Sequence, residues 1–351
     1  MIDFKTDSIL VTGAAGWLGQ ALLRALVQGI PDVPALAQPT PGLRIRALVA
    51  PGENAAGIRA VSPSIEIVEG DLRSPEVCAR FCKDAAGGLL FAAAGIIHPR
   101  RIADLYEVNR DGTVNTVRAA AAAGLRRAVV VSSNSPCGCN PAPDHRFDEE
   151  APYRPYLNYG RSKMEMEQRV RELQGIETVI VRPTWFYGPW QPPRQTLFFK
   201  MIRDGKAPIV GSGEGRRSMS YVDNTSQGLI LAATVAQAAG KTYWLADERP
   251  YSMNEIVDTV ERLLEREFGQ TCAHKRLRLP GIASSVAYAI DTVAQACGIY
   301  LQKIHVLSEM NKTIACSVDR AKKELGYAPT VALEEGMRRS LKWVVDNGQL
   351  A

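Results

Sequence analysis

Apolar residues 9–11 lead directly into a glycine-rich turn, which is followed by a helical stretch at residues 21–27. The turn is Gly13-x-x-Gly16-x-x-Gly19. In this order the first glycine allows a tight turn, the second lets backbone amides approach a phosphate, and the third lets the helix pack closely on the strand. The N-terminus of the helix favours negative charge. The start of the chain is therefore constrained to a strand–turn–helix unit suited to a dinucleotide pyrophosphate.

The composition is that of an ordinary globular protein. With 351 residues, of which 46% are hydrophobic and 23% charged, the chain can bury a full α/β core and carry a second lobe. The net charge of +5 is spread along the chain, so nucleic acid is not expected as a partner. The N-terminal Met-Ile-Asp-Phe-Lys-Thr-Asp leads directly into the first strand, so no signal peptide is expected. Seven cysteines, an odd number, then favour reduced thiols and a cytoplasmic location.

Two local patterns could indicate a metal site or a membrane segment. Cys137-x-Cys139 has no second pair of ligands, so we expect a loop and no metal. Residues 281–301 are mostly apolar, but Asp291, Thr292 and Gln295 interrupt them. Spanning a bilayer needs about 20 predominantly apolar residues. We therefore favour a packed helix without membrane association, and a surface-lying amphipathic helix is the alternative.

Apolar strand-like runs alternate with helical stretches through the first half of the chain. This alternation predicts an α/β fold with a Rossmann-like, doubly wound parallel sheet. The expected strands are 9–11, 45–49, 65–69, 89–92, 128–131 and 178–181. The expected helices are 17–27, 75–83, 105–123 and 159–173, followed later by 224–238, 253–267 and 282–296. Residues 28–43 contain four prolines and are expected to form a surface loop.

The residue composition changes after Arg182, where prolines and glycines become frequent and predict irregular structure. We expect a dinucleotide-binding domain over residues 1–182, to which residues 216–246 return. Residues 183–215 and 247–351 are expected to form a smaller, partly interleaved C-terminal lobe that binds the substrate.

Tyr159 and Lys163 lie four residues apart and therefore on one face of the expected helix. A phenol with a pKa near 10 is a poor acid or base at neutral pH. A neighbouring ammonium favours the phenolate and lowers that pKa. The pair is a candidate for proton transfer, although the same spacing also occurs on ordinary solvated helices.

Ser132, Ser133 and Asn134 follow the expected strand 128–131. They lie at the carboxyl edge of the sheet, where ligands of open α/β sheets bind. A hydroxyl there could bond a substrate oxygen while Tyr159 transfers its proton. An isolated Ser-Ser is ordinary turn chemistry, but the glycine turn, the serine and Tyr-x-x-x-Lys in this order are jointly much more specific.

Together these motifs resemble the extended short-chain dehydrogenases/reductases. This group is the NAD-dependent epimerase/dehydratase superfamily, with nucleotide-sugar epimerases and dehydratases, 3β-hydroxysteroid dehydrogenases and related reductases. The resemblance covers nearly the whole chain and implies NAD or NADP as cofactor. Further motifs that carry it are Gly70-Asp71-Leu72, Phe91-Ala92-Ala93-Ala94, Val108-Asn109-x-x-Gly112-Thr113, Arg182-Pro183-x-x-x-Tyr187-Gly188-Pro189, Tyr221-Val222-Asp223-Asn224 and Glu324-Leu325-Gly326-Tyr327-x-Pro329.

The resemblance also implies a role for each matching residue. Ser133 corresponds to the catalytic serine and Tyr159 to the acid/base. Lys163 would bond the nicotinamide ribose and lower the pKa of Tyr159. The expected cofactor contacts are Gly13, Gly16, Trp17 and Leu18 at the pyrophosphate, Asp71 and Leu72 at the adenine, Ala92, Ala93 and Ala94 along the cleft, and Tyr159, Lys163 and Pro183 at the nicotinamide.

The sequence does not decide between NAD and NADP. NAD-binding members usually carry an acidic residue at the end of the second strand, for the ribose 2′-OH, whereas NADP binders place an arginine nearby. Here Ala50 occupies that position. Glu53 could serve NAD, and Arg59 or Arg46 could serve NADP.

Three residues are expected to contact the substrate, namely Asn134, Trp185 and Arg217. Dehydratases resemble Ser-Thr-Asp-Glu after the fifth strand, and Asn134 stands here without a carboxylate, which disfavours elimination. Trp185 replaces the asparagine with which galactose-type epimerases contact the sugar, and an indole suits an apolar substrate better. Arg217 stands where nucleotide-sugar enzymes bind a diphosphate, and it could equally pair with Asp223 or face solvent.

The leading hypothesis is an NAD(P)-dependent oxidoreductase that interconverts a secondary alcohol and a ketone on a mainly apolar small molecule. The 3β-hydroxysteroid dehydrogenase-like branch is favoured. The alternative is a nucleotide-sugar 4-epimerase with tightly bound NAD, and a remote third is a catalytically silent cofactor-sensing protein. The resemblance further implies a homodimer.

Overall fold

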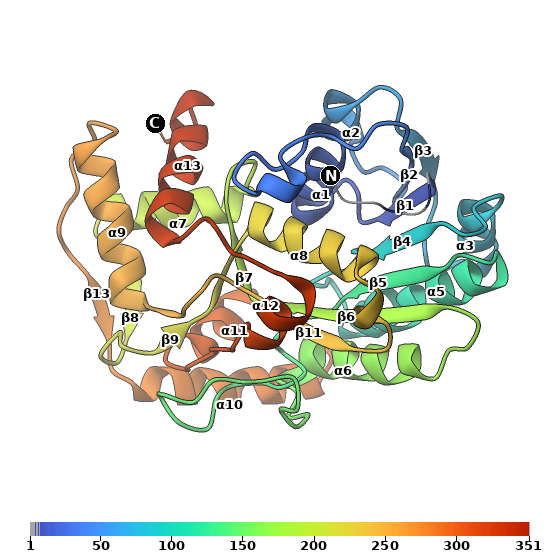
Figure 1. The fold of residues 1–351 in the computed structure, drawn as a ribbon. Coiled ribbons are helices and arrows are strands. Elements are labelled where there is room, and N and C mark those ends of the chain that lie inside the picture. Colours follow the sequence, from blue (N-terminus) through green and yellow to red (C-terminus); the bar gives the residue numbers. More distant parts are fainter. Residues whose placement is uncertain (1–3, 5, 7, 351) are drawn as a thin grey trace.

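A computed structural model describes Phe4, Thr6 and residues 8–350. Its centre is a seven-stranded, all-parallel sheet with the strand order β11-β6-β5-β4-β1-β2-β3 (Figure 1). Parallel strands buried on both faces read as continuous apolar runs, as in the Leu-Leu-Phe-Ala of β4. The strands are β1 (Ser8–Thr12), β2 (Arg44–Val49), β3 (Glu66–Glu69), β4 (Leu89–Ala92), β5 (Arg127–Val131), β6 (Glu177–Pro183) and β11 (Thr242–Leu245).

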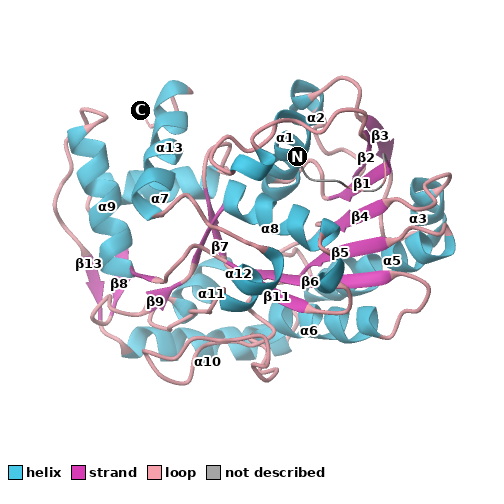
Figure 2. Cartoon of the chain, in the orientation of Figure 1, coloured by secondary structure: helices cyan, strands magenta, loops and turns pink. Residues whose placement is uncertain are grey.

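Helices cover both faces of the sheet. Ile9 and Val11 of β1 point into one core, with α1 (Trp17–Gln28) and α8 (Val222–Thr234). Leu10, between them, points into the other core. That face is covered by α3 (Pro75–Cys82), α5 (Thr113–Ala122) and α6 (Leu157–Arg171) (Figure 2). Shorter helices in this half are α2 (Ala56–Val61), α4 (Ile102–Asp104), the 3₁₀ turns Pro34–Leu36 and Ala236–Ala238, and a π-helical stretch, Leu105–Gly112.

The second lobe has a separate apolar core, to which Phe199, Ile256, Met337 and Leu341 contribute. Three two-stranded sheets connect its helices. They pair β7 (Trp185–Tyr187) with β10 (Met219–Tyr221), β8 (Pro208–Val210) with β13 (Leu277–Leu279), and β9 (Arg216–Arg217) with β12 (Tyr251–Ser252). The helices are α7 (Pro193–Arg203), α9 (Met253–Arg266), α10 (Ile282–Ala296), α11 (Gln302–Glu309) and α13 (Leu333–Asp346). Helix α12 (Asp319–Leu325) instead packs into the core of the large sheet through Ala321 and Leu325.

The six expected strands and the parallel, doubly wound sheet are confirmed, with boundaries shifted by at most a few residues. Two expectations were wrong in detail. The segment after Arg182 is not simply irregular, because Pro193 occupies the first turn of α7, where its missing N–H costs nothing. Residues 105–123 form a π-helical stretch followed by α5 rather than one regular helix. The helix expected over 282–296 is confirmed as α10, and it packs through the face that carries the polar residues Ser284, Asp291 and Gln295.

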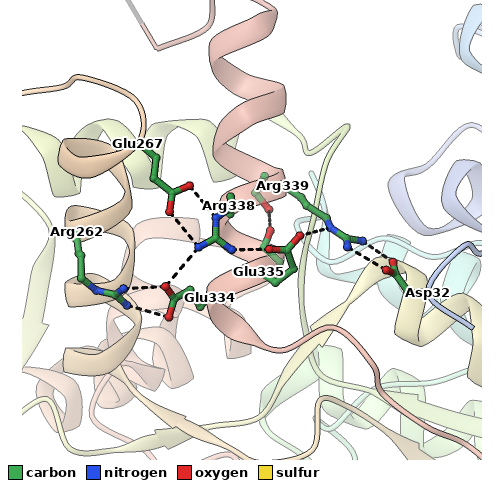
Figure 3. Close-up of polar contacts among 9 residues, drawn as sticks. Asp32, Arg262, Glu267, Glu334, Glu335, Arg338 and Arg339 are labelled. Atoms are coloured by element: carbon green, nitrogen blue, oxygen red, sulfur yellow. Dashed lines mark hydrogen bonds and ion pairs between the residues drawn. The ribbon is translucent and has the colours of Figure 1, made fainter.

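An ion-pair network joins the C-terminal helix α13 to both lobes (Figure 3). On one side Arg339 binds Asp32, in the loop after α1, through two hydrogen bonds of 2.5 and 3.1 Å. On the other side Arg338 binds Glu267 at the end of α9. Glu335 accepts from both arginines. The Arg339–Asp32 pair therefore connects the second lobe to the loop at the C-terminal end of α1.

Replacing Arg339 with methionine should lower the free energy of unfolding by about 0.5–1 kcal/mol, because both side chains of the pair are about one third exposed. Added salt should shrink the difference from wild type. Urea unfolding at low and high ionic strength measures both. Lys342→Met, which removes an exposed pair with Asp346 on the same helix, is the matched control and should change stability less. Equal losses in the two variants would contradict the connecting role of Arg339.

Candidate active site

A cavity of ≈ 440 Å³ lies at the carboxyl edge of the sheet, where β5 and β6 meet the second lobe. Ser133, Tyr159 and Pro183 line it from the sheet side. Most of its other walls are apolar, formed by Trp17, Ile97, Trp185, Phe186, Leu197, Phe198, Met201, Val306, Met310 and Ile314. The sheet edge thus gathers the predicted catalytic residues, and the second lobe supplies an apolar enclosure.

The glycine turn has no space for larger residues. Gly13 has φ of +67°, and a Cβ on it would lie 2.7 Å from the backbone of Ala94. A Cβ on Gly19 would lie 2.1 Å from the carbonyl oxygen of Gly13. Gly16 is the N-cap of α1, with no side-chain cap and no acidic residue in the first turn, which includes Trp17 and Leu18. The free amides and the helix dipole there fit the pyrophosphate of a dinucleotide.

The loop after β4 forms the neighbouring wall. Ala92 ends the strand, and the amide of Ala94 donates to the Thr12 hydroxyl at 3.2 Å. The buried Asn109 holds the continuation of this loop, since its amide side chain accepts from Ile96 N at 2.8 Å and donates to Ile96 O at 2.9 Å. The sequence offered Asn109 only as part of a resembling motif, and its role in fixing this loop comes from the structure.

The candidate residues for the adenosine half of the cofactor lie in β2 and in the loops that follow β2 and β3. Glu53 bends back so that its carboxylate accepts from Ala50 N at 3.3 Å. Arg46 points elsewhere and donates to Glu66 and to the carbonyls of residues 81 and 83. Asp71 is not a helix cap, because Ser74 caps α3. Its carboxylate instead accepts from the backbone and guanidinium of Arg73, and Leu72 follows it beside the start of α5.

The two serines after β5 have different surroundings. Ser132 donates to the buried carboxylate of Glu167 at 2.5 Å, so its hydroxyl is engaged beneath the sheet edge. The Ser133 hydroxyl makes long contacts of 3.4 Å with the side chains of Asn134 and Ser135, accepts from Ser135 N at 3.3 Å and bonds to the phenol of Tyr159, without a carboxylate partner among the described residues. This arrangement supports Ser133 as the hydroxyl available to a ligand.

Tyr159 and Lys163 extend from the first turns of α6 toward the sheet edge. Lys163 is buried, and its Nζ donates to the carbonyl of Val131 at 3.0 Å. Burial lowers the pKa of Lys163 to about 8. Burial raises the pKa of Tyr159, and the hydrogen bond from Ser133 opposes this only in part. The expected lowering of the Tyr159 pKa is therefore not found in the protein alone, where the lysine is directed to a backbone carbonyl.

A buried ion pair fixes α6 against the sheet. Glu167, one turn after Lys163, accepts from the guanidinium of Arg182 on β6 at 2.7 and 3.0 Å. It also accepts from Ser132 and from the hydroxyl of Tyr153. Because one carboxylate ties α6 to both β5 and β6, the positions of Ser133, Tyr159 and Lys163 depend on each other.

The residues expected to contact the substrate all line the cavity. Trp185 is half-buried, and its ring packs against Phe198 with centroids 5.7 Å apart. Arg217 donates to the carbonyl of Glu309 rather than to Asp223, and its buried Nε has no partner among the described residues. Trp17 contributes more than backbone, because its indole donates to Pro189 O at 2.8 Å and closes the cavity beside the glycine turn.

Three basic side chains in the cavity wall, namely His98, Arg194 and His305, belong to no motif that is visible in the sequence. Nδ1 of His98 lies 2.7 Å from the hydroxyl of Tyr300, and Nδ1 of His305 lies 2.7 Å from the carboxylate of Asp291. These residues come from the loop after β4, from α7 and from α11. Only tertiary structure brings such distant segments together. Among the described residues no group of three acidic, histidine or cysteine side chains could hold a metal ion.

Burial, with the charges of Arg194 and His305, lowers the pKa of His98 to about 4. An ordinary histidine has a pKa of 6.5, so the unfolded chain takes up this proton first as the pH falls from about 6.5 to 4. Acid should therefore destabilise the fold through His98 in that window. In thermal unfolding across pH 4–8, His98→Asn should lose less stability on the acid side than wild type. Parallel curves for the two proteins would contradict this.

Fold and cavity together define an α/β protein of the dinucleotide-binding class. A family model described as the NAD dependent epimerase/dehydratase family matches residues 9–246. The chain is 53% identical to the uncharacterized protein y4nL of Sinorhizobium fredii, over 99% of this chain and 98% of that protein. The chain therefore belongs to the NAD-dependent epimerase/dehydratase family of the extended short-chain dehydrogenases/reductases.

More distant relatives include enzymes with named reactions. The chain is 27% identical to 2-alkyl-3-oxoalkanoate reductase of Stenotrophomonas maltophilia, over 94% of this chain and 97% of that one. It is also 27% identical to the 3 beta-hydroxysteroid dehydrogenase/Delta 5→4-isomerase of Mycobacterium tuberculosis, over 96% and 90%. A dTDP-glucose 4,6-dehydratase from Streptomyces venezuelae, crystallised with NAD, matches the fold with a TM-score of 0.74 over 97% of each chain, at 23% identity. The protein is thus an NAD-dependent enzyme.

Proposed function

We propose that the protein is an oxidoreductase that interconverts a secondary alcohol and a ketone on a mainly apolar substrate. The observation that carries this proposal is the position of Ser133 and Tyr159 at the base of a cavity whose remaining walls are largely aliphatic and aromatic. The 27% identity to a 3-oxoacid reductase and to a hydroxysteroid dehydrogenase also supports it. Trp185 in the cavity wall also supports it, because an indole suits an apolar substrate.

In this proposal Ser133 donates a hydrogen bond to the substrate oxygen, and Tyr159 gives or takes the proton on that oxygen. The nicotinamide dinucleotide supplies or accepts the hydride when bound. The backbone around Gly13 and Gly16 and the start of α1 would hold its pyrophosphate, and Asp71, Leu72 and Ala92–Ala94 would line its cleft. Lys163 would leave the Val131 carbonyl for a ribose hydroxyl, and its ammonium would then favour the Tyr159 phenolate. Pro183, which lines the cavity, would lie beside the nicotinamide.

We further propose NAD rather than NADP as the preferred cofactor. Glu53 lies in the turn after β2, and its carboxylate folds back to Ala50 at the strand end, where it could accept from a ribose 2′-hydroxyl and repel a 2′-phosphate. Arg46, one of the two candidates for an NADP phosphate, is already bound to Glu66 and to two carbonyls. Arg59 is exposed on α2.

A nucleotide-sugar 4-epimerase is the second candidate. Arg217 favours it, because a guanidinium in the cavity wall with an unpartnered Nε could bind a diphosphate. The apolar character of the surrounding walls favours the oxidoreductase. A homodimer and a cytoplasmic location stay predictions.

Tyr159→Phe should lower kcat about 10²–10⁴-fold, because it removes the proton-transfer group while preserving the ring. The rate of NADH formation or consumption with 3β-hydroxysteroids and 2-alkyl-3-oxoalkanoates measures this. Tyr243→Phe is the matched control, since it removes a buried phenol hydroxyl on β11 that bonds Glu324 outside the cavity. It should leave kcat near wild type.

Full turnover by Tyr159→Phe would exclude the proposed chemistry. Interconversion of UDP- or GDP-sugars, without net NADH change and without activity on the apolar panel, would instead favour the epimerase.

Glu53→Gln should weaken NAD binding about tenfold and leave NADP binding unchanged or tighter, because it removes a charged acceptor for the 2′-hydroxyl. Dissociation constants for both dinucleotides, measured by fluorescence titration, provide the readout. Glu66→Gln removes a carboxylate that pairs with Arg46 on the neighbouring strands and should leave the NAD constant unchanged. Tighter binding of NADP than NAD by the wild type would exclude the assignment.

A further inference from the structure

Helix α10 is amphipathic with its apolar face turned outward. Its polar residues Ser284, Asp291 and Gln295 are buried. Ile282, Val286 and Val293 are 69%, 51% and 65% exposed. Their spacing of four and seven residues places them in one stripe along the helix, and Ile290 lies beside it. In Figures 1 and 2 this helix runs along the outer boundary of the molecule.

Hydrogen bonds hold α10 in this orientation. The Asp291 carboxylate lies 2.7 Å from Nδ1 of His305 and accepts from Gln295 at 3.0 Å. The Gln295 amide oxygen in turn accepts from the backbone and side chain of Asn158 at the start of α6. Ser284 donates to the carbonyl of Ser308 at 2.6 Å. Rolling the helix to bury its apolar stripe would break all of these bonds, so the outward apolar face is part of the folded state.

Within the segment that carries the stripe the exposed lysines and arginines have no exposed acidic counterpart. Between residues 269 and 308 the only acidic residue is Asp291, which is fully buried. Three lysine and arginine side chains in the same segment are exposed, namely Lys275 and Arg278 just before α10 and Lys303 just after it. An aliphatic stripe flanked along the chain by these cations complements a surface that is apolar beneath and negative at its boundary. Protein interfaces favour aromatic and arginine anchors at their centre, and this stripe has none.

The same apolar surface continues to the mouth of the cavity. Ile299 and Leu301, in the turn between α10 and α11, and Val306 on α11 are exposed. Val306 also lines the cavity, together with the exposed Ile97 and Leu197. Exposed apolar residues therefore continue from the end of α10 to α11, which forms one side of the cavity entrance.

We propose that the outer face of α10, formed by Ile282, Val286, Ile290 and Val293, docks on the anionic surface of a lipid bilayer. The attachment is peripheral, in keeping with the finding that no helix among the described residues could cross a membrane. It places the cavity mouth beside the lipid phase. The docking itself is independent of the proposed reaction, because it rests on α10 and not on the residues of the active site.

The test is flotation of the full-length protein with phosphatidylcholine vesicles and with mixed phosphatidylcholine–phosphatidylglycerol vesicles. Wild type should float with the mixed vesicles, and less with neutral ones or at high salt. Val286→Glu/Val293→Glu should reduce the bound fraction at least about tenfold, since it places two carboxylates in the stripe. Both sites are exposed, so thermal unfolding should be close to wild type. Val345→Glu on α13, which is 36% exposed and far from α10 in Figure 1, is the matched control and should still float.

Three results would overturn the proposal. The first is no flotation of wild type with either vesicle, and the second is undiminished flotation of the double variant. In the third, wild type is oligomeric by light scattering and does not bind vesicles, whereas the double variant is monomeric. A second copy of the chain would then cover the stripe. Activity on the apolar panel does not enter these outcomes, so a failure of the proposed reaction would be seen separately.

Discussion

The active-site geometry depends on one buried carboxylate. Glu167 accepts hydrogen bonds from Arg182, Ser132 and Tyr153, so it joins α6 to the ends of β5 and β6. Removing one partner of a buried ion pair commonly costs about 3–5 kcal/mol, because the remaining charge stays desolvated. The Glu167–Arg182 pair holds α6 against the sheet, and a shift of α6 would separate Tyr159 from Ser133. The same contacts therefore stabilise the fold and set the distance between the two proposed catalytic residues.

The second constraint is the contact between the two lobes. The indole of Trp17 reaches from the glycine turn to Pro189 in the second lobe, and Arg339 reaches from α13 to Asp32 after α1. Further around the cavity, Gln295 of α10 accepts from Asn158 at the start of α6, and the contact between Asp291 and His305 joins α10 to α11. The α10–α11 pair thus packs against α6, the helix that carries Tyr159. The buried polar face of α10 holds the pair in place, and the apolar face of α10 stays exposed.

Much of the first half could be predicted from local pattern. Continuous apolar strands, the glycine spacing and Tyr-x-x-x-Lys are short-range features. The strands are confirmed as β1 to β6, the glycine turn joins β1 to α1, and Tyr159 lines the cavity. The second half resisted prediction for a physical reason. Its strands β7 to β13 are two to four residues long, too short for periodicity to show, and α7 begins at a proline within a proline-rich run that indicates a loop when read locally. His98 carries no local signal, because its partner Tyr300 lies 202 residues away in the chain. The motif that contains Asn109 is visible in the sequence, but the loop that this residue fixes appears only in the structure.

By itself the sequence determined the dinucleotide-type turn, the parallel sheet and the order of the serine, tyrosine and lysine, since backbone conformation and strand burial leave their marks within a few residues. Tertiary structure decided which serine is free, because only the fold brings Glu167 to Ser132. It also decided that burial raises the Tyr159 pKa in the protein alone. Finally, it decided that the apolar stripe of α10 faces outward. The hydrogen bonds of the polar face to Asn158, His305 and Ser308 hold the helix in this orientation, although the stripe then stays exposed. Amphipathic pattern fixes which residues share a face, and only the partners across the interface determine which face is buried.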